Sequence, residues 1–213
     1  MEIQIKGTII PNDDKDIYEF FGYESTCPND VVNALENAEN DKIDIYINSG
    51  GGDIFSATEI YSAIQKHKDN VKIHVVGLAA SAASVIMCAA ENDISTTSMV
   101  MIHNVSTVAQ GNFKDFKHES ETLRKADRAM CQAYVDKSGK SESDFLPLMD
   151  KETWFTAREA VDIGLCDKIV GRDVLINGYC SFVTDEQRKQ FENIRTKAKA
   201  QIRLEKLKGD VKI

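Results

Sequence analysis

The stretch VKIHVVGLAASAASVIMCAA, residues 71–90, decides the fold. Its first part is rich in valine and isoleucine, and after Gly77 small residues lead into an apolar segment at helical density. The pattern predicts a strand, a tight corner and a buried helix, with Ser81 at the first helical turn. Backbone N–H groups have no intrahelical partner there, so an oxyanion formed nearby would be stabilised. Two interpretations stay open: Ser81 is a nucleophile among small neighbours, or it caps a core helix.

Length and composition predict an ordinary globular protein. The chain has 213 residues, 42% hydrophobic and 28% charged, which is enough for one domain with an appendage. No apolar run is long enough to cross a bilayer, and the N-terminus lacks the basic start and cleavage site of a signal peptide. The sequence therefore predicts a cytoplasmic protein.

Charge divides the chain into two parts. The net charge is −8, which argues against general nucleic-acid binding. Residues 184–213 carry nine Lys or Arg and five Asp or Glu, a net +4, so residues 1–183 carry about −12 by subtraction. We expect a body over 1–183 and a basic, mostly helical tail over 184–213. The tail has only a thin apolar stripe, so it is either a solvated extension or a docking helix for a partner.

Five cysteines are scattered along the chain, and no two form a C-x-x-C pair. An odd number at such spacing indicates reduced thiols that pack in the interior, rather than disulfides or a zinc site. They are Cys27, Cys88, Cys131, Cys166 and Cys180.

The first half of the chain predicts parallel strands. Residues 2–9 alternate like a first strand, and a helix is expected from Pro28. A strand over 43–48 ends at three glycines, and a helix from Ile54 leads into the strand at residue 71; such a unit implies parallel pairing with a right-handed crossover. The glycines at 50–52 fit neither G-x-G-x-x-G nor a P-loop. They instead suit a backbone N–H that faces a substrate oxygen, as in an oxyanion hole.

Residues 94–103 predict a further strand, which ends at His103. A histidine here is either a catalytic base or a group satisfied at a strand end. Asp150 and Glu152, which precede a well-capped helix, are either surface charges or candidates for orienting a histidine. By composition alone His103 looks no different from the other histidines, His67, His74 and His118.

The second half of the chain predicts helices. Residues 112–137 show one long helical pattern with a narrow apolar stripe, which indicates that part of the helix projects and packs against another subunit. A short helix is expected over 144–149. The capping box Thr156–Glu159 opens another helix, which Gly164 terminates, and residues 166–170 predict a last short strand.

Four motifs occur in a distinctive order: INSGGG at 47–52, GLAAS at 77–81, MIH at 101–103 and WFTAREAVDIGLCD at 154–167. In order and spacing they resemble the ClpP family of serine peptidases, over nearly all of residues 2 to 170. The resemblance implies an α/β fold of repeated ββα units with a crotonase-like core. It also implies homo-oligomeric rings around an inner chamber, with residues 112–137 as the projecting handle helix through which two rings meet.

The resemblance assigns roles to five residues. Ser81 matches the nucleophile and His103 the general base, while Glu152 stands at the acid position, where the family more often has aspartate. Gly52 and Ala82 match the residues whose backbone N–H groups form the oxyanion hole. Peptidases of this kind need no cofactor and no metal.

Three positions depart from the family pattern. Gly50 stands where proline is usual, which loosens the loop that carries the oxyanion-hole glycine. Asn104 follows the histidine where glutamine and proline are common. Glu152 is one methylene longer than aspartate, so Asp150 remains an alternative third member of the triad.

The basic tail and a start almost directly at the first strand resemble the ClpP-like proteases of phage and prophage heads. We therefore expect a serine endopeptidase that trims scaffold or capsid polypeptides, with no nucleic-acid or membrane partner and little reason to expect an ATPase. Deletion of 184–213 should then leave peptide cleavage intact and impair capsid processing. The alternatives are a housekeeping ClpP subunit driven by an ATPase, a catalytically silent ring scaffold, and a crotonase-type acyl-CoA enzyme.

Overall fold

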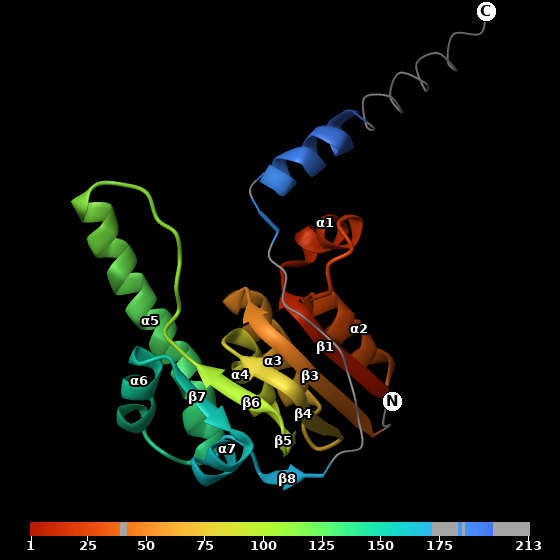
Figure 1. The fold of residues 1–213 in the computed structure, drawn as a ribbon, viewed down its shortest axis with the longest axis vertical. Helices are drawn as coiled ribbons and strands as arrows, with labels where there is room; N and C mark the ends of the chain where they lie inside the picture. Colours follow the sequence, from red (N-terminus) through yellow and green to blue (C-terminus); the bar gives the residue numbers. More distant parts are fainter. Residues whose placement is uncertain (39–41, 172–182, 185, 198–213) are drawn as a thin grey trace, which may run out of the picture.

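A mostly parallel sheet forms the centre of the protein (Figure 1). The computed structural model describes residues 1–38, 42–171, 183–184 and 186–197. Within these residues eight strands form one sheet: β1 (Glu2–Ile9), β2 (Ser25–Thr26), β3 (Ile43–Gly52), β4 (Val71–Ala80), β5 (Glu91–Ser95), β6 (Met99–Ile102), β7 (Thr153–Thr156) and β8 (Lys168–Val170).

Strand β4 is the strand at which the sheet divides. One edge of β4 pairs with β3, and β3 continues the sheet through β1 to β2. The other edge pairs with β5 near the start of β4 and with β6 near its end. All of these pairs are parallel, whereas β7 joins β6 in the antiparallel direction. The parallel sheet expected from the strand–helix–strand order is confirmed, and the fold is of the α/β class expected.

Helices cover one face of the sheet, because alternate residues of the central strands are apolar and buried. Ile45 of β3 and Ile73 of β4 are fully buried, and Ile60 and Ile64 of α3 pack in the same core. Burial of each such side chain contributes about 1.5–3 kcal/mol. Within residues 1–171 except 39–41, the helices are η1 (Asn12–Asp14), α1 (Lys15–Phe20), α2 (Pro28–Asn37), α3 (Ile54–Lys66), α4 (Ala82–Ile86), η2 (Met87–Ala89), α5 (Phe113–Ser138), α6 (Glu142–Asp150) and α7 (Ala157–Asp162).

Three predicted boundaries need correction. The expected strand over 94–103 is two strands, β5 and β6, because a turn closed by a hydrogen bond from Ser98 N to Ser95 O (3.0 Å) separates them. Strand β3 runs on through the glycines to Gly52, and β4 continues through Gly77 to Ala80. The corner of the first motif therefore lies at Ser81 itself.

Helix α5 confirms the predicted projecting helix. It begins after Asn112, whose side chain accepts a hydrogen bond from Lys114 N (2.8 Å), and it ends before Gly139 in the left-handed conformation. Its buried residues are confined to the second half, whereas Phe113 at its start is 77% exposed. Figure 1 shows this first half extending away from the sheet. None of the described helices has the length and apolar character that a membrane span requires.

The tail begins with a helix over residues 186–197, as the sequence predicts. It lies beside α1, a helix that the sequence analysis did not predict (Figure 1). Phe191 of the tail meets Phe20 edge to face, with ring centroids 5.4 Å apart, and Arg188 pairs with Asp14. Residues 198–213, the rest of the predicted tail, lie outside the described residues. The division into a body and a separate tail stays a prediction.

Four of the five cysteines are buried and unpaired: Cys27, Cys88, Cys131 and Cys166. Burial raises the pKa of the Cys131 thiol to about 11 and that of the Cys166 thiol to about 12. Protonated, enclosed thiols are poor nucleophiles and behave as small apolar side chains, in line with the packing role expected. Cys180 lies outside the described residues.

Candidate active site

The carboxyl ends of neighbouring parallel strands bring the candidate residues together. Ala80, the last residue of β4, lies opposite Met101 in β6. Ser81 follows directly on β4 and His103 directly on β6, so both side chains emerge at the same edge of the sheet. Open α/β sheets commonly hold their ligands at this edge.

Ser81 and His103 form a hydrogen-bonded pair. The Nε2 atom of His103 lies 2.7 Å from Ser81 Oγ. Ser81 has φ 54° and ψ −125°, a backbone conformation that an L-residue adopts at a cost of about 1–3 kcal/mol. Its N–H donates to the Met101 carbonyl (2.9 Å), which fixes the corner between β4 and α4. The strained corner turns the hydroxyl out of the sheet and towards the imidazole.

The Ser84 hydroxyl holds the Ser81 backbone, and the Tyr134 hydroxyl in turn contacts Ser84. Ser84 Oγ donates to the Ser81 carbonyl (2.6 Å) and lies 2.7 Å from the hydroxyl of Tyr134 on α5. Both residues are buried, and burial raises the pKa of the Tyr134 hydroxyl, so this group stays protonated. Tyr134 lies within the long helical pattern predicted over residues 112–137, and nothing in the sequence pointed to its link with Ser84.

The glycine segment packs directly against the serine. A Cβ on Gly51, which has φ 94°, would lie 2.7 Å from Ser81 Cβ and 2.9 Å from Ala82 N. A Cβ on Gly52 would overlap the Ile9 carbonyl. The Gly51 N–H donates to Ser49 Oγ (3.1 Å), which anchors the segment. Sequence reasoning singled out Gly52, whereas the requirement for glycine next to Ser81 is strongest at Gly51.

A small cavity of about 60 Å³ opens beside the Ser–His pair. The two residues expected to supply oxyanion-hole N–H groups, Gly52 and Ala82, line this cavity together with Ser81 and His103. Four of the five expected site residues therefore line one cavity. Val85 and Met130 contribute apolar walls.

Each of the two candidate acids accepts a hydrogen bond from a residue other than His103. Glu152 has φ 49°, and its Oε1 accepts a hydrogen bond from Trp154 Nε1 (3.3 Å). Asp150 Oδ1 accepts from Asn104 Nδ2 (2.8 Å). Within the described part of the chain, the His103 ring makes its hydrogen bond to Ser81 and none to a carboxylate. The choice between Glu152 and Asp150 therefore stays a prediction.

A carboxylate that the sequence analysis did not single out lies close by. Asp127 of α5 accepts a hydrogen bond from Val105 N (2.6 Å), two residues after His103. Burial raises the pKa of the Asp127 carboxyl; the charge of Asp150 adds to the rise, and the Val105 N–H and the His103 charge oppose it. Asp127 and Asp150 thus hold the segment that follows His103 from two different helices. On the sequence Asp127 was one charge among many on the polar face of α5.

The described residues contain no group of three or more His, Cys, Asp or Glu side chains placed to hold a metal ion. The chemistry available from the chain itself is that of a hydroxyl in contact with an imidazole, beside backbone N–H groups. Such a pair can form a covalent acyl intermediate on the serine.

This fold and this pair are typical of serine hydrolases built on an α/β sheet. The chain belongs to the Clp protease family, whose family model, described as Clp protease, matches residues 24–173. One relative is the ATP-dependent Clp protease proteolytic subunit 1 of Protochlamydia amoebophila (strain UWE25), 33% identical over 129 residues. This alignment covers 58% of the present chain and 63% of that protein, so the chain spans less than two thirds of the relative's length.

Proposed function

We propose that this chain is a serine endopeptidase in which Ser81 is the nucleophile and His103 the general base. The observation that carries the proposal is the 2.7 Å contact between Ser81 Oγ and His103 Nε2. His103 takes the hydroxyl proton as the oxygen attacks a peptide carbonyl, and it then returns the proton to the leaving amine. Water releases the acyl group in a second round of the same chemistry.

The backbone N–H groups of Gly52 and Ala82 are proposed to bind the oxyanion of the tetrahedral intermediate. Both residues line the cavity beside Ser81. Loss of one such donor costs about 10²–10³ in kcat in enzymes of this type. We keep Glu152 as the third member of the triad and Asp150 as its alternative. Either carboxylate would hold the imidazole tautomer and stabilise its charged form, after exchanging its present partner for His103.

A specific role in phage or prophage head maturation is part of the proposal. The substrates would be scaffold or capsid polypeptides, and the working form a homo-oligomeric ring, with two rings meeting through α5. The exposed first half of α5 supports this arrangement, since Phe113 and Phe116 are apolar and largely open to solvent. The location in bacterial or infected-host cytoplasm stays a prediction. A housekeeping subunit that works with an ATPase is the second candidate, favoured by the relative's printed name.

A fluorophosphonate probe tests the chemistry directly. We expect the probe to label Ser81, and labelling and peptide cleavage to be lost in Ser81→Ala and His103→Ala. Ser62→Ala and His67→Ala, on or next to α3 and remote from the Ser–His pair, are the matched controls and should keep both. An unreactive Ser81 in the unaltered protein would favour the silent scaffold, and labelling that survives His103→Ala would contradict the base assignment.

The role is tested by the requirement for nucleotide. Discrete cuts in a scaffold or capsid protein, made by the purified chain alone, would support head maturation. Cleavage of folded substrates only when an ATPase and ATP are added would support the housekeeping candidate instead.

A further inference from the structure

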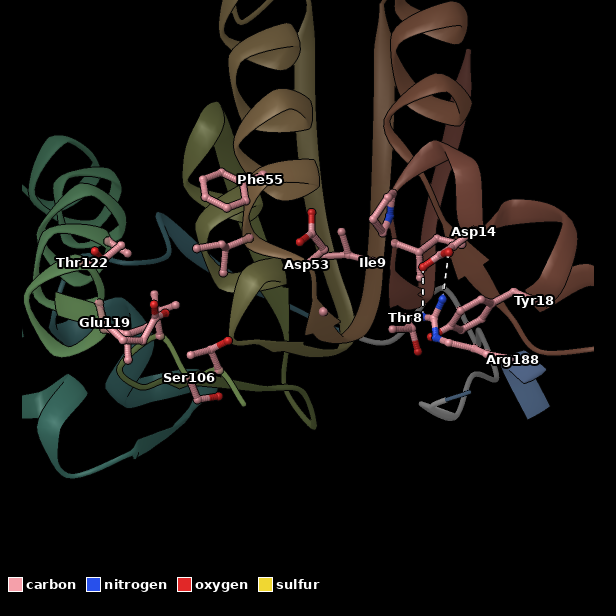
Figure 2. Close-up of a pocket in the computed structure, with 18 residues that line it drawn as sticks. Thr8, Ile9, Asp14, Tyr18, Asp53, Phe55, Ser106, Glu119, Thr122 and Arg188 are labelled. Atoms are coloured by element: carbon pink, nitrogen blue, oxygen red, sulfur yellow. Dashed lines mark hydrogen bonds and ion pairs between the residues drawn. The ribbon is translucent and has the colours of Figure 1, made fainter. Parts of the chain in front are cut away.

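A large cleft continues from the catalytic cavity towards the tail. It has a volume of about 520 Å³, and it shares Gly52, Ile54, Val105 and Ser106 with the smaller cavity that contains Ser81 and His103. Figure 2 shows it running from Glu119 and Thr122 of α5, past Asp53, to Thr8, Tyr18 and Arg188. A polypeptide whose scissile bond lies at Ser81 can therefore place neighbouring residues in this cleft.

The tail helix forms the far end of the cleft. Arg188 makes a two-pronged ion pair with Asp14, Nη1 to Oδ1 at 2.9 Å and Nη2 to Oδ2 at 3.0 Å (Figure 2). A fork-to-fork pair of this kind fixes direction as well as distance. Arg188 thus becomes part of the cleft wall although it is 174 residues away from its partner in sequence.

Several contacts besides the ion pair keep the helix docked. Gln187 Nε2 donates to the Tyr23 hydroxyl (2.8 Å), and Phe191 packs with Val183 against a small apolar cluster. The cluster is formed by Ile10, Ile17, Tyr18 and Cys27. Because apolar burial contributes to docking, replacement of one partner of the ion pair should leave the helix in place.

The cleft carries an excess of negative charge that Arg188 reduces. Among the described residues that line it, the carboxylates are Asp14, Asp53 and Glu119, and Arg188 is the one Lys or Arg. The formal charge is therefore −2, from three carboxylates and one guanidinium, and it would be −3 without Arg188. Asp14 and Arg188 lie together at one end of the cleft. A change in their charge therefore affects the substrate residue that binds at that end.

We propose that Arg188 is a specificity-determining residue, which neutralises Asp14 and so suppresses a preference for basic side chains at the far end of the substrate cleft. The proposal rests on the function proposed above, because it assumes that the cleft binds the polypeptide being cut. It also changes the expectation for the tail: its removal would alter which peptides are cleaved, in addition to any effect on a partner.

Two single substitutions should act in opposite directions. Arg188→Gln leaves the Asp14 carboxylate without its countercharge and should favour Lys over Glu in the substrate. Asp14→Asn removes the negative charge of Asp14 from the guanidinium and should favour Glu over Lys. The assay measures kcat/KM for pairs of fluorogenic peptides that differ only by Lys or Glu at one position. That position is moved one residue at a time along the peptide.

At the position that reaches the far end, the Lys-to-Glu ratio of kcat/KM should rise about five- to thirty-fold in Arg188→Gln. This fold-change corresponds to about 1–2 kcal/mol, the sum of one exposed charge–charge interaction for the Lys peptide and one for the Glu peptide. The ratio should fall by a similar factor in Asp14→Asn, and both changes should shrink as salt is added. Arg195→Ala is the matched control, since Arg195 lies on the same helix and pairs with Glu192 away from the cleft.

Unchanged ratios in both variants at every peptide position would overturn the proposal, and so would an equal shift in Arg195→Ala. A failure of the proposed function is recognised separately, because Ser81 would then not react with the fluorophosphonate. In that case the same Lys and Glu peptides are tested for binding to the unaltered protein and the two variants by fluorescence polarisation. Opposite shifts in affinity would support the charge-setting role, and equal affinities would refute it.

Discussion

Replacement of His74 by glutamine should destabilise the protein strongly and in a pH-dependent way. His74 of β4 lies on the face of the sheet opposite the helix-covered core, between two carboxylates. Its Nδ1 is 2.7 Å from Asp93 Oδ1 and its Nε2 is 3.0 Å from Asp44 Oδ1. Lys72 Nζ lies 3.1 Å from the second Asp93 oxygen, and the Tyr46 ring stacks on the imidazole at 4.9 Å. Both ring nitrogens face acceptors, so the geometry favours the charged imidazolium.

The size of the effect follows from the burial of Asp93, whose side chain is 2% exposed. Removal of one partner from a buried ion pair costs about 3–5 kcal/mol. His74 retains 17% exposure and Lys72 remains as a countercharge, so we expect about 2–3 kcal/mol for His74→Gln. For a chain of this length that loss lowers Tm by roughly 4–12 °C.

The pKa shifts fix the direction of the pH dependence. The Asp93 hydrogen bond raises the pKa of His74 above its usual 6.5, against the opposing effect of burial. This contribution is fully present below pH 6.5 and is lost as pH rises through the raised value. Burial alone would raise the Asp93 pKa, but His74 and Lys72 lower it below 3.8, so its contribution is lost as pH falls through that lowered value. Both contributions are present between 3.8 and 6.5.

Urea denaturation of the unaltered protein and His74→Gln, repeated from about pH 5 to pH 9, measures this difference. The loss should be largest in the acidic part of the range and should shrink as pH rises. His67→Gln is the control, because the His67 ring has no carboxylate partner among the described residues. This substitution should change the free energy of unfolding little. A loss below about 1 kcal/mol near pH 5.5, or one that grows towards pH 9, would refute this account of the network.

Three further substitutions test how the site is held. Gly51→Ala should abolish peptide cleavage, because the added Cβ would lie 2.7 Å from Ser81 Cβ. Gly22→Ala, with φ 69° and open space around it, controls for backbone strain alone, and equal activity in the two variants would contradict the reasoning. Tyr134→Phe removes the hydroxyl that meets Ser84 and should lower kcat several-fold at unchanged KM, with a stability loss of about 1 kcal/mol in thermal denaturation. Asp127→Ala should lower kcat about tenfold by freeing the backbone after His103, the proposed general base. Asp127→Asn, which retains an acceptor oxygen, should keep most of the rate in the same assay.

The central strands could be predicted from the sequence because local pattern determines them, whereas the pairing of Ser81 with His103 was expected only from the resemblance to a known family. Alternating apolar residues define β3 and β4, and a strand–helix–strand order implies parallel pairing. Parallel strands that end together bring the residues after them together, so Ser81 and His103 meet although 22 residues separate them. The resemblance to a known family added the roles, and the family match at residues 24–173 agrees with it.

Contacts between distant elements could not be predicted in this way. By composition His74 and His103 are equivalent, yet one lies in mid-strand between carboxylates and the other at a strand end beside a serine. Asp127 carries no local signal, since a charge on a long helix is usually solvated. The pairing of Arg188 with Asp14 depends on where the tail helix docks, which tertiary packing decides.

Glu152, the proposed third member of the triad, is held in place less firmly than Ser81 and His103 are. The distance between Ser81 and His103 is set by strand register, which involves many backbone hydrogen bonds and resists change. The position of Glu152 is set by one left-handed residue between α6 and β7 and by a side-chain contact of 3.3 Å to Trp154. One exposed hydrogen bond of this kind is worth about 1 kcal/mol, little more than thermal energy. We therefore expect that a small input, such as substrate binding or contact with a second subunit, can redirect the carboxylate. The same input could not bring Ser81 and His103 together if the strands held them apart.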